Sequence, residues 1–140
     1  MAFAGINYLA VLVAAVAAWL VGAVWYKVLS EQWLAALEKT RSELMGPDGK
    51  PKSFVPLVLV LVAEIIMAWV LAGILGHLGD VTVKNGVVSR AFCWLGFVVT
   101  TVATNNAFPR RKIMLTVIDS GHWLAVLVVM GAIIGAFGVK

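Results

Sequence analysis

The sequence predicts an all-α integral membrane protein with four transmembrane helices. Of its 140 residues, 62% are hydrophobic and the mean hydropathy is +0.99, whereas soluble domains average roughly 45–50% apolar residues. The apolar residues form four stretches, each long enough to cross a hydrocarbon core of about 30 Å. Because little chain remains for a separate soluble domain, we expect residues 1–140 to form a single transmembrane domain.

The expected spans must be helices, because a helix satisfies its own backbone hydrogen bonds in lipid. They cover residues 5–28, 54–78, 86–108 and 113–139. The second span contains Glu64, and the fourth contains Asp119 and His122. The third has Arg90 near its start, where the long side chain is expected to reach the outer membrane surface.

Lysine and arginine indicate the orientation of the spans. Eight of them lie in or beside the two connections on one side: Lys27, Lys39, Arg41, Lys50, Lys52, Arg110, Arg111 and Lys112. Three belong to the other side: Lys84, Arg90 and Lys140. Because the more positive connections stay in the cytoplasm, both termini are expected outside the cell.

The long connection between the first two spans is expected to contain one amphipathic helix over residues 30–45. Ser30 suits the N-cap and Glu31 the first turn. The apolar side chains of this segment are Trp33, Leu34, Leu37, Leu44 and Met45. They favour a helix that lies on the cytoplasmic membrane face, either as an interfacial anchor or as a lid or docking element.

Small residues predict where the helices pack. The first span repeats them every four residues, and the fourth has a G-x-x-x-G pair: Ala10, Ala14, Ala18 and Gly22, then Gly131 and Gly135. Such surfaces let two backbones approach closely, within the chain or between copies. Since four helices bury few residues, we expect a homo-oligomer or a partner membrane subunit in addition to the lipid bilayer.

Ionisable residues inside the spans are the main candidates for a functional site, because exposing them to lipid costs several kcal/mol. Glu64 has no partner nearby in sequence. It is either a carboxylate that binds a proton or a cation, or a protonated side chain hydrogen-bonded to another helix.

Asp119 and His122 share a helical face, since they are three residues apart. In one interpretation the carboxylate orients the imidazole for proton transfer or ligand binding. In another the pair binds a metal with Glu64 as the third ligand, although one histidine at this spacing is a weak metal signal. In the third it forms a structural hydrogen bond with Asn105 or Asn106, across the short turn between the last two spans.

Trp25 and Tyr26 end the first span and are typical of an interfacial aromatic belt. Asn105 and Asn106 end the third span on the same side of the membrane. All four spans therefore place polar or amphipathic groups in the cytoplasmic half. A site there would have Trp25 and Tyr26 at its mouth.

The sequence does not indicate an enzyme. Its single cysteine, Cys93, lies in an apolar run with no base close in sequence, and no nucleophile–base pair, strong metal-ligand set or cofactor motif is visible. No basic surface with interleaved aromatic residues indicates nucleic-acid binding. We therefore expect no catalytic residues, no metal and no cofactor.

Three short motifs carry a family resemblance: GAVWYKVL, NNAFPRRK and IDSGHWL. Together they resemble a family of small bacterial membrane proteins known only as a domain of unknown function with four predicted spans. The matching positions are Gly22, Trp25, Tyr26, Asn105, Asn106, Phe108, Asp119, Gly121 and His122. The resemblance implies this fold class and a bacterial inner-membrane location, and it implies no activity.

Two functional hypotheses follow. In the first, the polar cluster binds a small ligand or couples its transport to protons, in an oligomer. In the second, the chain is a structural or accessory subunit of a membrane complex, and its polar residues only join helices. An intramembrane enzyme is a weaker third hypothesis. A cavity that opens from the polar face to the cytoplasm favours the first hypothesis, and a dry, fully paired polar network favours the second.

Overall fold

The computed structural model describes residues 5–138, which form a bundle of helices without strands. Four helices are long and apolar enough to cross a membrane: Tyr8–Val28, Val55–Leu78, Val83–Ala107 and Ile113–Phe137. The prediction of an all-helical chain with four such spans is confirmed. Residue 139 of the predicted fourth span lies outside the described residues.

The spans divide into six helical elements. The first span is α1 (Tyr8–Val28), the second is α4 (Val55–Leu78) and the fourth is α7 (Ile113–Phe137). The third joins α5 (Val83–Cys93), the π-helical turn η1 (Trp94–Val98) and α6 (Val99–Ala107). It starts earlier than predicted because the Thr82 hydroxyl accepts a hydrogen bond from the Asn85 N–H at 3.2 Å and caps the helix.

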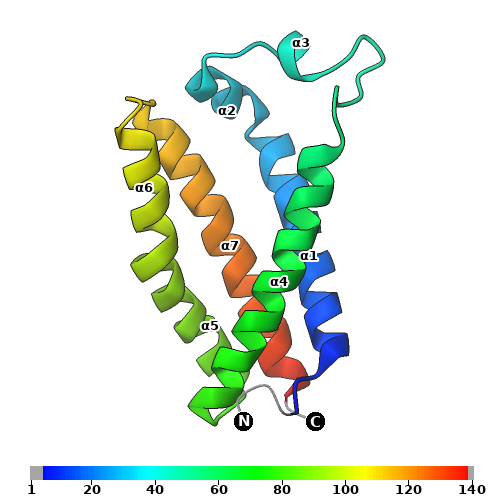
Figure 1. Cartoon of the computed structure of the whole chain (residues 1–140), viewed down its shortest axis with the longest axis vertical. Coiled ribbons are helices and arrows are strands. Elements are labelled where there is room, and N and C mark those ends of the chain that lie inside the picture. The colour runs from blue at the N-terminus through cyan, green and yellow to red at the C-terminus, as the bar shows by residue number, and fades with distance from the viewer. Residues whose placement is uncertain (1–4, 139–140) are drawn as a thin grey trace.

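Helix α7 lies at the centre of the bundle (Figure 1). It packs against α1 on one side and against α5 and α6 on the other, whereas α4 packs mainly against α1. Accordingly, α7 has the largest buried share of the four spans and the third span has the smallest. The residues of α7 therefore decide which parts of the chain meet.

Small side chains line the buried faces of α1 and α4. Ala10, Ala14 and Ala18 of α1 are buried, as is Ala68 of α4. Larger side chains of α1 point outward instead, and they are Leu12, Val16 and Leu20. Small residues on a buried helix face let neighbouring backbones approach closely, and the large apolar groups remain on the exposed face.

The glycine pair of α7 packs against the start of the third span. A β-carbon on Gly131 would overlap the backbone of Gly86 and lie 2.6 Å from Cγ of Arg90, and one on Gly135 would overlap the backbone of Thr82. Helices α5 and α7 therefore cross with their backbones in contact. Both predicted small-residue surfaces are used within the chain, so neither supports contact between copies.

The connection after α1 contains two short helices, α2 (Ser30–Leu37) and α3 (Arg41–Leu44). The prediction of one helix over residues 30–45 is therefore wrong. Glu38 adopts the left-handed conformation, with φ of 58°, and ends α2. Its location on the membrane surface stays a prediction.

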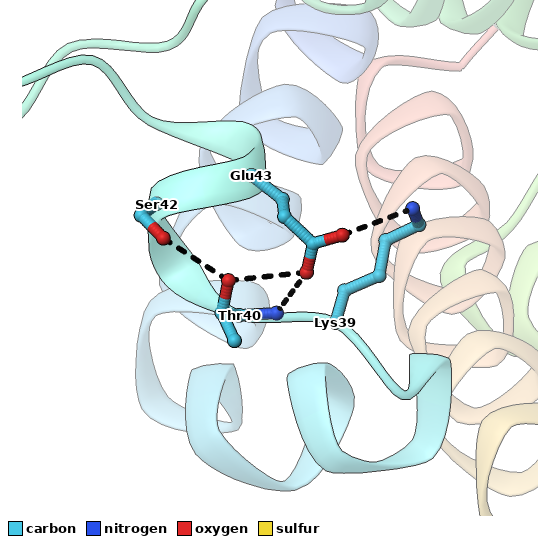
Figure 2. A network of polar contacts seen from close by, with 4 residues as sticks. All are labelled: Lys39, Thr40, Ser42 and Glu43. Carbon is cyan, nitrogen blue, oxygen red and sulfur yellow. Dashed lines mark hydrogen bonds and ion pairs between the residues drawn. The ribbon is translucent and has the colours of Figure 1, made fainter.

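A capping box starts α3 (Figure 2). The Thr40 N–H donates to the Glu43 carboxylate at 2.6 Å, and the Lys39 ammonium lies 3.8 Å from the other carboxylate oxygen. The hydrogen bond from the Thr40 backbone is the main reason that the pKa of Glu43 lies below its usual value. Such a local box favours a new helix start over continuation of α2.

Helix α2 is attached to the turn between α6 and α7. Lys112 in this turn donates to the Ala35 carbonyl oxygen at 3.2 Å and lies 3.3 Å from the Glu38 carboxylate. A cation at this position is favourable because the carboxyl end of a helix carries partial negative charge. Figure 1 shows α2, α3 and this turn at one end of the bundle, here called the connection end, whereas α1 begins and α7 ends at the other. Which end faces the cytoplasm stays a prediction.

Candidate functional site

The candidate site lies at the connection end, where α1 meets α7. The Tyr26 hydroxyl of α1 donates a hydrogen bond of 2.7 Å to Oδ1 of Asp119 on α7. This distance suits a hydroxyl that donates to a carboxylate. Both side chains are partly buried. The two residues thus join helices whose sequences lie far apart.

Four rings continue from this bond as an aromatic row, made up of Trp33, Tyr26, His122 and Trp123. Tyr26 meets Trp33 of α2 edge-on, with ring centroids 5.2 Å apart, and meets His122 at 4.9 Å. His122 in turn meets Trp123 at 4.8 Å. The Trp33 side chain also interacts with the Asp119 carboxyl group. The carboxyl group therefore lies at the polar groups of two aromatic side chains, Tyr26 and Trp33.

Two indole groups fix the backbone of α7 beside Asp119. The Trp25 N–H donates to the Ile118 carbonyl oxygen at 3.1 Å, and the Trp94 N–H donates to that of Ser120 at 2.7 Å. Trp25 belongs to α1 and Trp94 is the first residue of η1, so α7 is held from two neighbours. Trp25 is therefore bonded to α7, and its place in an interfacial aromatic belt stays a prediction.

Two glycines make these contacts possible. A β-carbon on Gly121 would lie 2.9 Å from Cζ2 of Trp25, so this indole packs directly on the α7 backbone. A β-carbon on Gly22 would lie 2.9 Å from Nε2 of His122. Gly22 was predicted as a helix-packing residue, and it packs specifically against this imidazole.

His122 is 3% exposed, and its Nδ1 has no hydrogen-bond partner among the described residues. The same is true of the buried Ser120 hydroxyl. No direct hydrogen bond joins His122 to Asp119 in the described structure: the Tyr26 hydroxyl donates to Asp119, and the Tyr26 ring contacts the imidazole. The cluster therefore contains buried polar atoms without a hydrogen-bond partner among the described residues, which is uncommon in folded proteins.

The two asparagines of the third span do not reach Asp119. Asn106 donates instead to the Thr116 hydroxyl on α7 at 3.0 Å, and Asn105 is exposed. The predicted structural bond between Asp119 and these asparagines is therefore wrong. Asp119 faces α1, where Tyr26 takes the role expected of an asparagine.

Glu64 is separate from this cluster. It is 0% exposed on α4, and neither carboxyl oxygen has a hydrogen-bond partner among the described residues. Within the same part of the chain, no ion pair or hydrogen bond joins it to Asp119 or His122. The structure thus divides the predicted polar site into a cluster between α1 and α7 and an isolated acid on α4.

Arg90 is buried, so its predicted extension to the membrane surface is wrong. It is 0% exposed, its Nη2 donates to the Leu71 carbonyl oxygen of α4, and Nε and Nη1 have no partner among the described residues. The stem of Arg90 passes over Gly131, where a side chain would block it. The arginine therefore reaches inward because α7 offers no side chain at that point.

A metal site has no geometric support. Within residues 5–138, no three side chains of histidine, cysteine, aspartate or glutamate come close enough to hold an ion. An open apolar groove of about 660 Å³ does border the cluster. It is lined by Leu20, Val21, Val24, Trp25, Val28 and Leu29. Trp25 is common to the groove and the cluster.

Sequence reasoning missed three members of this region, namely Trp33, Trp94 and Ser120. Trp33 was interpreted only as part of an apolar stripe. The available signal was a set of tryptophans: Trp25 near the end of the first predicted span, Trp33 in the following connection and Trp94 within the third span. A buried indole usually finds a hydrogen-bond partner for its N–H group. Their convergence on α7 required the helix arrangement.

Comparison with known proteins places the chain in one family. A family model described as "Protein of unknown function (DUF1761)" matches residues 9–135, and the chain belongs to that family. This confirms the resemblance based on the three motifs. No curated protein matches the chain, and no solved structure matches it.

Proposed function

We propose that the chain binds a small amphipathic cation at the junction of α1 and α7, and couples this binding or its transport to a proton. The observation that carries the proposal is the partly buried Asp119 carboxyl group, which accepts a hydrogen bond from Tyr26 and is bordered by the aromatic row. We further propose that the chain is oligomeric and lies in the bacterial inner membrane with both termini outside.

The chemistry of the cluster supports a cationic ligand. A carboxylate attracts positive charge directly, and the faces of tryptophan and tyrosine rings add about 0.5–2 kcal/mol through cation–π attraction. Tyr26 and Trp33 provide such rings next to Asp119. An anion would meet an acid here, so anionic ligands are disfavoured.

The apolar groove supports an amphipathic rather than a purely polar cation. It runs along α1, and its lining includes Trp25, whose indole packs on α7 beside Asp119. A hydrocarbon group in this groove would remain in an apolar environment while its charged end reached the carboxylate.

Binding of two defined cations would test the proposal. Tetraphenylphosphonium and dodecyltrimethylammonium would be added to the purified, detergent-solubilised chain, with tryptophan fluorescence and calorimetry as the readouts. We expect saturable binding that weakens at least about tenfold in Asp119→Asn, since a charged partner is worth about 1.5–3 kcal/mol.

Asp80→Asn is the matched control, because Asp80 lies in an exposed connection away from the cluster. It should bind like the native chain. The proposal would be overturned if Asp119→Asn and Asp80→Asn lost cation binding equally, or if the native chain showed no saturable binding of either cation.

A second candidate function is that of a structural or accessory subunit. Helix α6 favours it, because this part of a predicted span exposes Thr100, Thr101, Thr104 and Asn105. Each threonine hydroxyl donates to a carbonyl oxygen four residues earlier, so the helix itself satisfies the three donors. Disulfide cross-linking of Thr101→Cys in native membranes tests this role, and an uncrosslinked monomer would count against it.

A further inference from the structure

Glu64 lies on the buried face of α4. The buried residues of this helix include Glu64, Ala68, Leu71, Ala72 and Leu75. Their spacing places them along one side, so Glu64 continues an otherwise apolar stripe toward the connection end. Its carboxyl group is fully buried, and both oxygens are unpartnered among the described residues.

This environment disfavours a charged carboxylate. An ionised group that leaves water without gaining hydrogen bonds or a counter-charge loses far more free energy than a neutral one. Asp119 differs, because the Tyr26 hydroxyl donates to it. Two carboxyl groups in such different surroundings are suited to different protonation states.

The helices packed around α4 supply few groups that could change this balance. Helix α1 has no titratable side chain between Ala10 and Gly22, and α7 has none after His122. The third span contributes Cys93, the buried Arg90 and Lys84, which is exposed near its start. Besides Glu64, α4 itself has only His77, which is exposed near its end.

Arg90 is the nearest identified cation on this face of α4. It donates to the carbonyl oxygen of Leu71, which is two helical turns, or on the order of 10 Å, beyond Glu64. No ion pair joins Arg90 to Glu64 in the described structure. The arginine can therefore favour loss of a proton from Glu64 only from a distance.

We propose that Glu64 is a proton-binding site inside the bundle, and that the two acids have separate tasks: Asp119 binds the cation while Glu64 takes up and releases the coupled proton. The proton-binding site itself is inferred only from the burial of Glu64 and from its lack of hydrogen-bond partners among the described residues. Its coupling to a ligand rests on the proposed function.

A hydrophobic carbodiimide tests the proton-binding site directly. The protonated carboxyl group of Glu64 would add across one C=N bond of dicyclohexylcarbodiimide, with its proton passing to nitrogen. The resulting O-acylisourea rearranges to a stable N-acylurea, and no other reactant is required. Mass spectrometry of peptides would then locate the adduct.

We expect one adduct on Glu64 at neutral pH, less of it as the pH rises, and none in Glu64→Gln. Asp119→Asn is the matched control and should retain the adduct. An adduct on Asp119 instead, or no adduct on Glu64 at neutral pH or below, would overturn the assignment.

Infrared spectroscopy supplies a second measurement on the native chain, so the test does not depend on the folding of one variant. A carbonyl band of a protonated carboxyl group should be present at neutral pH. It should shift in Glu64→Asp and disappear in Glu64→Gln. Absence of this band from the folded native chain would also overturn the assignment.

Proton release on addition of dodecyltrimethylammonium separates this inference from the proposed function. If Glu64→Gln binds the cation but releases no proton, the proposed function and the coupling role of Glu64 are both supported. If Glu64→Gln still releases a proton and Asp119→Asn does not, the coupling role of Glu64 fails while the proposed function survives. If no cation binds but Glu64 is labelled, the proposed function fails and the proton-binding site stands.

Discussion

The two halves of α7 contact the bundle through different parts of the chain. Near the connection end, side chains reach α7: Tyr26 donates to Asp119, and indoles donate to the carbonyl oxygens of Ile118 and Ser120. Toward the other end, Gly131 and Gly135 bring the α7 backbone against that of the third span. One half is joined by directional bonds and the other by close backbone packing.

This difference indicates where change is tolerated. Backbone contact leaves no room for an added atom, so the glycine half should be rigid and intolerant of substitution. Side-chain contacts can be altered one hydrogen bond at a time and leave groups such as Nδ1 of His122 unpaired. The half that can exchange partners is the half in which we place the ligand.

The largest expected effect is the loss of stability when the glycine half of α7 is disrupted. Gly131→Ala places a β-carbon against the Gly86 carbonyl and Cγ of Arg90, so α5 and α7 must separate. We expect a loss of at least about 2 kcal/mol of stability, measured by thermal unfolding of the solubilised chain. Gly96→Ala is the control, because a β-carbon there meets nothing within 4 Å. Equal melting temperatures for the two variants would contradict the expectation that stability depends on the close packing of α5 against α7.

A smaller effect is expected in the other half. Trp25→Phe removes the hydrogen bond to Ile118 but keeps an aromatic ring on Gly121. The expected loss of stability is about 1 kcal/mol, read from the same unfolding measurement. Trp19→Phe is the matched control, because its indole N–H donates to the Leu57 carbonyl oxygen at 3.4 Å, and this longer, exposed hydrogen bond should matter less. A larger loss in Trp19→Phe would contradict the importance of the contact with α7.

The smallest effect is expected outside α7, at the capping box of α3. The pKa of Glu43 is lowered in the folded state, so its contribution is present above the unfolded-state pKa and is lost as the pH falls through the lowered one. Hydrogen-exchange protection over residues 40–45 should therefore decrease in acid. In Glu43→Gln it should be low at every pH, with the melting temperature unchanged. Equal protection in both chains would contradict the role of the box.

Hydropathy was sufficient to predict the four spans. A helix that crosses a bilayer must be long and apolar, and both properties are visible directly in the sequence. The alanines of α1 and the glycines of α7 were also predicted as packing surfaces, because small residues at regular spacing have few other uses in a span.

The partners of the polar residues could not be predicted. Asp119 faces Tyr26 rather than Asn105 or Asn106 because α7 lies between α1 and the third span, and sequence proximity favoured the wrong neighbour. Arg90 is buried because Gly131, which lies on another helix, leaves room for its stem. Both outcomes depend on how helices are rotated about their axes.

Local conformation and helix assignment also limited the prediction of the site. The left-handed Glu38 divides a segment whose apolar pattern alone indicated one helix. Glu64 and Asp119 both lie in the first halves of their spans, yet they are separate because α4 packs mainly against α1 and only slightly against α7. Depth along a span was predictable, but the neighbouring helix was not.

The central position of α7 has a consequence for the order of biosynthesis. Translation proceeds from the amino terminus, so α7 is the last of the four spans to leave the ribosome. The Tyr26–Asp119 bond joins residues 93 positions apart. Tyr26 therefore has no Asp119 partner until α7 has been synthesised. The first three spans are therefore synthesised before their common neighbour exists, and the bundle can be completed only after α7 has followed them.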